Sequence, residues 1–203
     1  MSDNITVDEL KLYHECGHTI LAKLFEDYLE LEGVTLSPGK VLEGNALEGT
    51  GAGTNIKLKR FNSEGQDAFA IMLLAGFVGQ NIFLRGREHI LMMRQEFVNN
   101  PDKFTKDFCS GDWQLFQFEA AGNALARKID TVEYLRFCLR FLVDFLCDEK
   151  IWKIVEKLAI KIKSQTDLTL KKDQLGLFFK STGLNDYLNE IKPALFSTLG
   201  FSL

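Results

Sequence analysis

The residues best suited to chemistry form one five-residue stretch, His14-Glu15-Cys16-Gly17-His18, which has the pattern H-E-x-x-H. On a helix, positions four apart lie on the same face, so the two imidazoles can bind one zinc ion. Zinc lowers the pKa of a bound water from 15.7 to roughly 7. A neighbouring carboxylate can take the proton of that water and pass it to a leaving amine. The stretch therefore predicts a zinc site at His14 and His18, with Glu15 as the general base.

The residues around the motif predict the helix that positions it. Thr6 and Glu9 have the spacing of a capping box, so we expect a helix over residues 7–28. An apolar stripe with a 3.6-residue period passes through both histidines; it contains Leu10, His14, His18, Leu21 and Phe25. A buried histidine without a partner is costly, so a shared ligand explains this placement better than two ordinary histidines do.

The two residues inside the motif carry their own predictions. Helix geometry turns Cys16 away from the face of the two histidines, so we expect it to pack rather than to bind metal. Gly17 costs about 1 kcal/mol relative to alanine in the middle of a helix. Its presence predicts a second element packed closely against the helix at this point.

Composition and charge bound the remaining functions. The chain has 203 residues, of which 46% are hydrophobic and 26% charged, so we expect one large domain with its own core. The net charge of −4 gives no basic footprint for a nucleic-acid partner. No G-x-x-x-x-G-K-[ST] stretch encodes a phosphate-binding loop.

Cysteine usage and hydropathy suggest the compartment. The four cysteines contain no C-x-x-C pair, and the polar start of the chain lacks an apolar signal region. The run from Ala68 to Gly79 is the longest apolar one and is too short to cross a bilayer. We therefore expect reduced thiols, a cytoplasmic location and no membrane span.

After the first helix the sequence predicts a small hairpin and then helices. We expect a strand over residues 33–37, a turn at Pro38-Gly39, a glycine-rich connection over 45–55 and a second strand over 56–59. Lys57, Lys59 and Arg60 are expected on a solvated edge. The helices are expected over residues 63–85, 87–98, 110–128 and 131–163, the last with a break near Cys147-Asp148. Residues 168–175 look like a loop leading into a short helix, and residues 183–203 form a tail to which no structure is assigned.

A catalytic zinc site usually has three protein ligands, and the residues alone leave the third one open. The candidates are His89, Asp107, Asp112 and Glu119. His89 lies on an amphipathic stretch with charged neighbours, which favours an exposed side chain. Asp112 falls in the expected first turn of a helix, where the helix dipole favours a carboxylate whether or not it binds metal.

Five segments together resemble the peptidase domain of the FtsH-type ATP-dependent zinc proteases, peptidase family M41. His14–Thr19 is similar to the family's HEAGHA block, and Val34–Gly39 resembles the strand that follows it. Ala75–Phe83 resembles the block GGRVAEELIF, and Ser110–Leu115 lies where the family has its ligand segment. Leu168–Leu175 resembles the closing helix-turn element. The resemblance covers residues 6–179, and only the first block is highly specific.

The resemblance implies a fold, a reaction and a ligand set. The expected fold is a mainly α-helical zinc-peptidase domain over residues 1–203 with a small β-hairpin over 33–61. The implied ligands are His14, His18 and Asp112, with Glu15 as base. The implied activity is zinc-dependent endopeptidase cleavage of flexible or unfolded polypeptides, held along the edge of the hairpin. Polypeptide is the expected partner, and homo-oligomer formation stays open.

The chain also departs from the family. It carries neither the ATPase module nor transmembrane segments, Gln80-Asn81 replace an acidic pair, and residues 87–104 look like an insertion. The alternative function is therefore a non-catalytic or regulatory module that acts through protein contacts, for example with a separate ATPase. Glu15 favours the enzyme, because a module without catalysis has no need of it.

Overall fold

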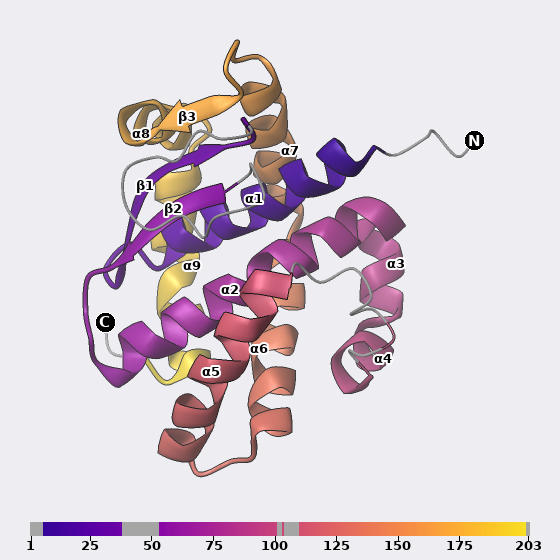
Figure 1. Cartoon of the computed structure of the whole chain (residues 1–203), viewed down its shortest axis with the longest axis vertical. Helices are drawn as coiled ribbons and strands as arrows, with labels where there is room; N and C mark the ends of the chain where they lie inside the picture. The colour runs from indigo at the N-terminus through magenta and orange to yellow at the C-terminus, as the bar shows by residue number, and fades with distance from the viewer. Residues whose placement is uncertain (1–5, 38–52, 101–102, 104–109, 202–203) are drawn as a thin grey trace.

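The computed structural model of the chain describes residues 6–37, 53–100, 103 and 110–201. Its secondary structure is 74% helix, with nine helices and one three-stranded sheet in the described residues, as a mainly α fold requires. The elements in chain order are α1 (Val7–Leu24), β1 (Leu29–Thr35), β2 (Gly53–Leu58), α2 (Ser63–Arg85), α3 (Arg87–Met92), α4 (Arg94–Asn99), α5 (Ser110–Arg127), α6 (Thr131–Leu146), α7 (Glu149–Lys163), β3 (Thr169–Lys171), α8 (Lys172–Ser181) and α9 (Leu184–Leu199). Figure 1 shows α1 and α2 side by side through the middle of the molecule.

Helix α1 begins as predicted and ends earlier. Thr6 and Glu9 form the capping box, in which the Thr6 hydroxyl accepts from the Glu9 N–H at 3.2 Å. The helix ends at Leu24 rather than at residue 28, and the chain turns through Phe25 and Tyr28 into β1. Both aromatic rings are buried against Phe196 and Phe201, so the apolar side chains continue past the helix end. No glycine marks this end, which is why the sequence pattern overran it.

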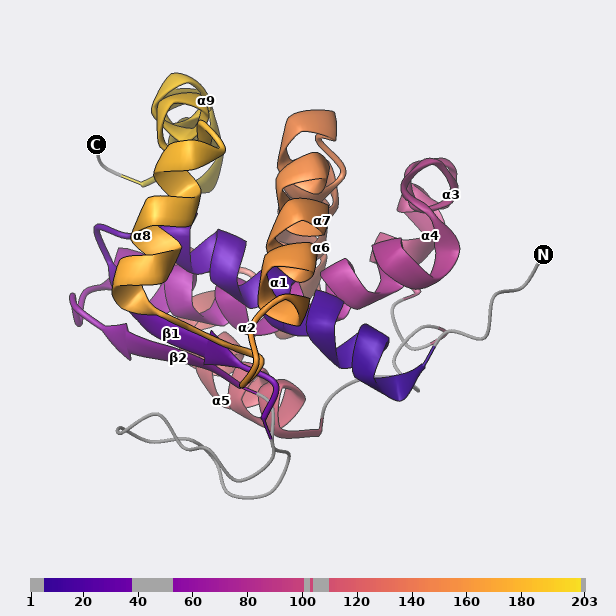
Figure 2. The same cartoon turned by 90° about the horizontal axis from the view of Figure 1, so that it is seen from above.

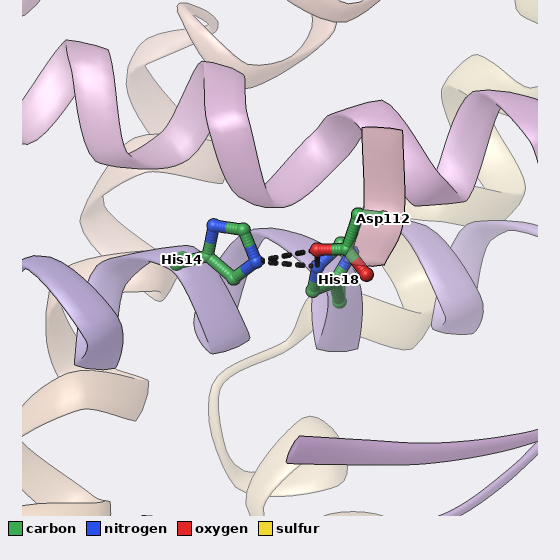
Figure 3. A group of neighbouring side chains, drawn as sticks. All are labelled: His14, His18 and Asp112. Atoms are coloured by element: carbon green, nitrogen blue, oxygen red, sulfur yellow. Dashed lines mark hydrogen bonds and ion pairs between the residues drawn. The ribbon is translucent and has the colours of Figure 1, made fainter. Parts of the chain in front are cut away.

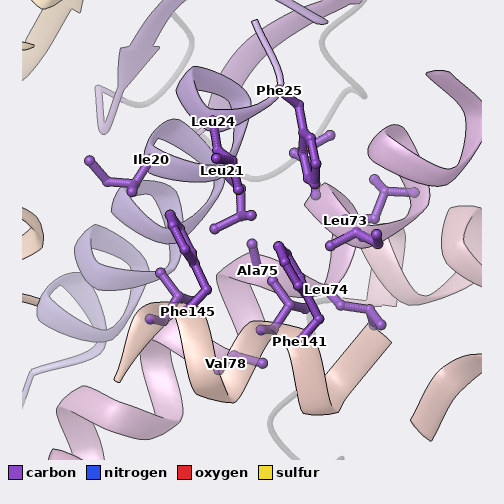
Figure 4. Close-up of a cluster of buried hydrophobic side chains, with 14 of the residues drawn as sticks. Ile20, Leu21, Leu24, Phe25, Leu73, Leu74, Ala75, Val78, Phe141 and Phe145 are labelled. Atoms are coloured by element: carbon purple, nitrogen blue, oxygen red, sulfur yellow. The ribbon is translucent and has the colours of Figure 1, made fainter. Parts of the chain in front are cut away.

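Helix α2 matches the predicted residues 63–85 and is buried on most sides. Asn62 caps it, accepting from the Gly65 N–H at 2.9 Å. It lies between α1 and the α5–α6 pair (Figure 1). Figure 4 shows how side chains from three helices interlock along it. The labelled ones are Ile20, Leu21 and Leu24 of α1 with Phe25 just after it, Leu73, Leu74, Ala75 and Val78 of α2, and Phe141 and Phe145 of α6. Each large apolar side chain buried in this way contributes roughly 1.5–3 kcal/mol to folding.

Helix α2 is also long and apolar enough to cross a membrane, although the continuous apolar run in the sequence is short. However, 83% of its most apolar 18-residue window is buried inside the molecule. The protein's own core therefore covers the surface that lipid would otherwise contact.

The sheet has the strand order β2-β1-β3, and both pairings are antiparallel. Strand β1 begins at Leu29, four residues before the predicted start, and β2 begins at Gly53 rather than at Ile56. Strand β2 is an edge of the sheet, and its residue Lys57 and the following Lys59 and Arg60 are exposed, as predicted. The predicted turn at residues 38–39 and most of the glycine-rich connection lie outside the described residues.

The sequence analysis missed strand β3. Residues 169–171 were expected in a loop, but they pair with β1, and the Thr169 and Thr35 hydroxyls lie 2.7 Å apart. A three-residue strand is too short to show a period of two, and its pairing partner is far away in the sequence. The predicted small hairpin is therefore two strands of a three-stranded sheet.

The helices after α2 differ from the predictions in detail. Residues 87–98, expected as one stretch, form α3 and α4 joined at Met93. The break near Cys147 is confirmed, because α6 ends at Leu146 and Asp148 caps α7. Figure 2 shows α7, α8 and α9 on one side of the layer that contains α1, α2 and the sheet, and α5 on the other side.

The tail at residues 183–203, to which no structure was assigned, contains helix α9 despite Pro193 in its interior. Proline has no backbone N–H, so the carbonyl of Asn189, four residues earlier, lacks its helical hydrogen bond. Both Pro193 and Asn189 are exposed, so water can hydrate that carbonyl.

Candidate metal centre

Two helices bring the predicted site residues together. His14 and His18 project from one face of α1, and Asp112 comes from the first turn of α5 (Figure 3). A polar network fixes α5 against α2. Arg127, at the end of α5, donates to both Asp67 Oδ2 and the Leu199 carbonyl, at 2.7 and 2.8 Å. The network links α5 to α2 and to the end of α9.

The three side chains converge on one point. The Nε2 atoms of His14 and His18 lie 2.9 Å apart. Asp112 Oδ2 lies 2.8 Å from Nε2 of His14 and 3.2 Å from Nε2 of His18. Within the described residues, this is the one group of His, Cys, Asp or Glu side chains close enough to share an ion. The histidines are 4% and 5% exposed, so the group is largely withdrawn from water.

The other ring nitrogens differ between the two histidines. Nδ1 of His18 donates to the backbone carbonyl of Met72 on α2, at 2.8 Å. This bond fixes the ring orientation and directs Nε2 at the shared point, as outer partners of metal-binding histidines do. Nδ1 of His14 is buried and has no hydrogen-bond partner among the described residues.

Hydrogen bonds alone explain the close approach of the two Nε2 atoms and the Asp112 carboxylate poorly. The contacts of His14 and His18 with Asp112 each require a proton on the Nε2 atom concerned. Two such protons would then face each other across the 2.9 Å between the nitrogens. A divalent cation instead accepts a lone pair from all three atoms at once. The donor set, two imidazoles and one carboxylate, therefore fits a bound zinc ion.

Without an ion, the site is an ion-pair cluster with shifted pKa values. Burial by itself lowers the pKa of His18, but the charge of Asp112 and its hydrogen bond raise it to about 9. Burial by itself raises the pKa of Asp112, but the charge of His18 and the hydrogen bonds to both imidazoles hold it well below its usual range. The cluster thus keeps Asp112 ionised, which is the form that binds a metal.

Two glycines make room for the two histidines at the interface between α1 and α2. A Cβ atom on Gly76 of α2 would lie 2.5 Å from Nε2 of His18 and 2.6 Å from Nε2 of His14. A Cβ atom on Gly17 would overlap the Ala75 carbonyl. The prediction that Gly17 marks a close neighbour is therefore confirmed, and the neighbour is α2. Any side chain at position 76 would occupy the space beside the two nitrogens.

Glu15 lies on the same helix, between the two histidines in sequence, and is 7% exposed. Its carboxylate accepts from the Thr54 hydroxyl of β2 at 2.7 Å. Its backbone carbonyl accepts from the Thr19 hydroxyl at 2.8 Å. The edge strand of the sheet therefore contacts the predicted general base directly.

The other candidates for the third ligand lie elsewhere. His89 is exposed on α3, and Glu119, further along α5, is not part of the group. Asp107 lies outside the described residues. Cys16 is fully buried and contributes no ligand atom to the group, and burial raises its pKa well above the ordinary thiol value. Among the described candidates, the structure brings only Asp112 to the histidines.

Sequence reasoning missed three groups at the site: the Met72 carbonyl, Gly76 and Thr54. A backbone acceptor carries no sequence signal. Gly76 lies in the Ala75–Phe83 segment, but a glycine in an apolar helix does not reveal what packs on it. Thr54 was included in the glycine-rich connection, where a lone threonine suggested no partner.

Comparison with known proteins adds no relative. No protein-family model, no curated protein and no solved structure matches the chain.

Proposed function

We propose that the chain is a zinc-dependent metalloendopeptidase of the M41 type that hydrolyses peptide bonds in flexible or unfolded polypeptides. The observation that carries the proposal is the convergence of His14, His18 and Asp112 beside Glu15. Two of these residues follow from the H-E-x-x-H motif. The third comes from a different helix, 94 residues beyond His18, so helix periodicity alone does not explain its arrival.

Each side chain then has a defined task. His14, His18 and Asp112 would hold the zinc ion, which when bound supplies a Lewis acid for the scissile carbonyl and for an attacking water. Glu15 takes a proton from the water at its carboxylate and returns it to the leaving amine. Strand β2, as an edge strand, offers backbone groups that can hold an extended peptide.

The direct ion pairing of Asp112 with both histidines favours a second candidate, a structural cluster in a non-catalytic or regulatory module. Such a module would act through contacts with other proteins. It gives no role to Glu15, which takes no part in the cluster but is held by its own hydrogen bonds.

One experiment separates the two candidates. The purified protein is analysed for metal content and then incubated with an unfolded, fluorescently labelled polypeptide, beside the Glu15→Gln variant. The peptidase proposal expects about one zinc per chain in both proteins and cleavage only by the parent. A protein that neither contains zinc nor takes it up would refute the proposal and leave the structural cluster.

A further inference from the structure

We infer that Thr54 is a positioning residue for Glu15: its hydroxyl holds one carboxylate oxygen and so fixes the direction of the other. This inference rests on the proposed function. It concerns a residue on the edge strand β2, outside the metal-binding helix and outside every motif of the sequence.

The Thr54 hydroxyl reaches two acceptors on Glu15, and the carboxylate is the nearer one. Two hydroxyls, those of Thr19 and Thr54, lie near two acceptors, the carbonyl and the carboxylate of Glu15. Each hydroxyl has a single proton to donate. Thr19 donates to the carbonyl at 2.8 Å. Thr54 lies 3.2 Å from that carbonyl but 2.7 Å from Oε2, so its proton goes to the carboxylate.

The bond from Thr54 restrains the Glu15 side chain, whose carboxylate could otherwise rotate away from the proposed metal. The glutamate of H-E-x-x-H lies one residue from a metal ligand, but three rotatable bonds separate its carboxylate from the helix. A hydrogen bond to a charged oxygen is stronger than a neutral one and selects one rotamer. With Oε2 engaged, the second oxygen is the one available for proton transfer. Misplacing a general base by about 1 Å can cost on the order of 100-fold in rate.

The placement of Thr54 also links two parts of the proposed site. The residue after Gly53 lies at the start of β2, opposite Val34 of β1. The same strand therefore carries the sheet edge proposed to hold the peptide and the group that orients the base. A substrate paired with β2 would therefore lie at a fixed position relative to the strand whose Thr54 side chain holds Glu15.

The test compares Thr54→Val, which keeps the shape and loses the hydroxyl, with Thr54→Ser, which restores the hydroxyl. A matched control is Thr35→Val, which removes a buried hydroxyl of the same sheet that lies 2.7 Å from that of Thr169 and makes no hydrogen bond to Glu15. We expect Thr54→Val to lower kcat by about 10- to 100-fold at unchanged KM and zinc content, while Thr54→Ser and Thr35→Val keep kcat within about twofold. A kcat of Thr54→Val equal to that of Thr35→Val would overturn the inference.

A second measurement needs no activity. Thermal midpoints are recorded for Thr54→Val and Thr35→Val, each in the parent and in a Glu15→Ala background. If the hydroxyl binds the carboxylate, Thr54→Val lowers the midpoint by about 2–4 °C in the parent and by less than half of that without Glu15. The shift caused by Thr35→Val is the same in both backgrounds. Equal shifts of Thr54→Val in both backgrounds overturn the inference, whether or not the protein cleaves polypeptides. A parent that cleaves nothing but retains the coupling refutes only the peptidase proposal.

Discussion

The Nε2 atom of His14 lies 2.8 Å from Oδ2 of Asp112, although 98 residues separate the two in the sequence. Between them the chain forms strands β1 and β2, the central helix α2 and the short helices α3 and α4. Asp112 arrives because α5 packs on α2 and is tied to it through Arg127 and Asp67. The site thus depends on a tertiary contact and not on the helical motif alone.

The first prediction concerns the third ligand. Asp112→Ala should lower zinc affinity by at least about 100-fold, because it removes a ligand and leaves two imidazoles alone. His89→Ala, on an exposed face of α3, should leave affinity unchanged. Competition with a chromogenic chelator measures both. Retention of zinc by Asp112→Ala together with its loss from His89→Ala would show that the assignment is wrong.

The second prediction concerns Glu15. Glu15→Gln should keep the zinc content of the parent and lose about 10²- to 10⁴-fold in peptide cleavage, because the amide cannot accept the proton. Metal analysis and cleavage of a quenched fluorescent peptide test this on one protein sample. Cleavage at the parent rate contradicts the role of Glu15 as a base.

The third prediction concerns pH. In the metal-free protein the pKa of His18 is about 9, above its ordinary value of 6.5. A raised pKa in the folded state stabilises that state below pH 6.5, and this contribution is lost as the pH rises through about 9.

Zinc binding must displace the same proton. Its affinity should therefore rise by about tenfold per pH unit up to about pH 9, with about one proton released per ion at pH 7. Calorimetric titrations in two buffers of different ionisation enthalpy count the proton. A zinc affinity that is constant between pH 7 and 9 would contradict the assignment of His18 as a zinc ligand with a raised pKa.

The fourth prediction compares two glycines in helix interiors. Gly17→Ala should destabilise the protein by about 1–3 kcal/mol, because the new methyl group overlaps the Ala75 carbonyl and forces α1 from α2. Gly122→Ala, on the exposed face of α5 with no side chain or neighbouring element within 4 Å of the new methyl group, should stabilise it by about 0.5–1 kcal/mol. Urea denaturation of the two variants and the parent measures their free energies of unfolding. A stabilised Gly17→Ala protein would show that α1 and α2 are not in close contact.

Local patterns predicted the parts of the fold that local forces determine. The capping box at Thr6 and Glu9 predicted the start of α1, and the helix expected over residues 63–85 matches α2 at both ends. Strand β3 and helix α9 were missed, the first because it depends on pairing with β1, the second because Pro193 disfavours a helix where exposure makes it tolerable. Such elements depend on their surroundings, which a window of sequence does not contain.

The candidate site divides in the same way. Helical spacing is enough to place His14 and His18 on one face. For the third ligand, the residues alone left four candidates, and the family resemblance favoured Asp112. Thr54 and Gly76 had no signal, because their importance arises from what the fold places beside them.

The separation of 94 residues between His18 and Asp112 also determines when the site is completed during protein synthesis. A ribosome adds roughly 5–20 residues per second, so Asp112 is made about 5–20 seconds after the histidines. Until α5 has emerged and docked on α2, the growing chain has the two imidazoles and the base but not the carboxylate. If the chain is a peptidase, its cutting activity therefore begins only after more than half of it has been synthesised. The order of the ligands along the sequence would then keep the enzyme inactive while the first half of its own chain is being made.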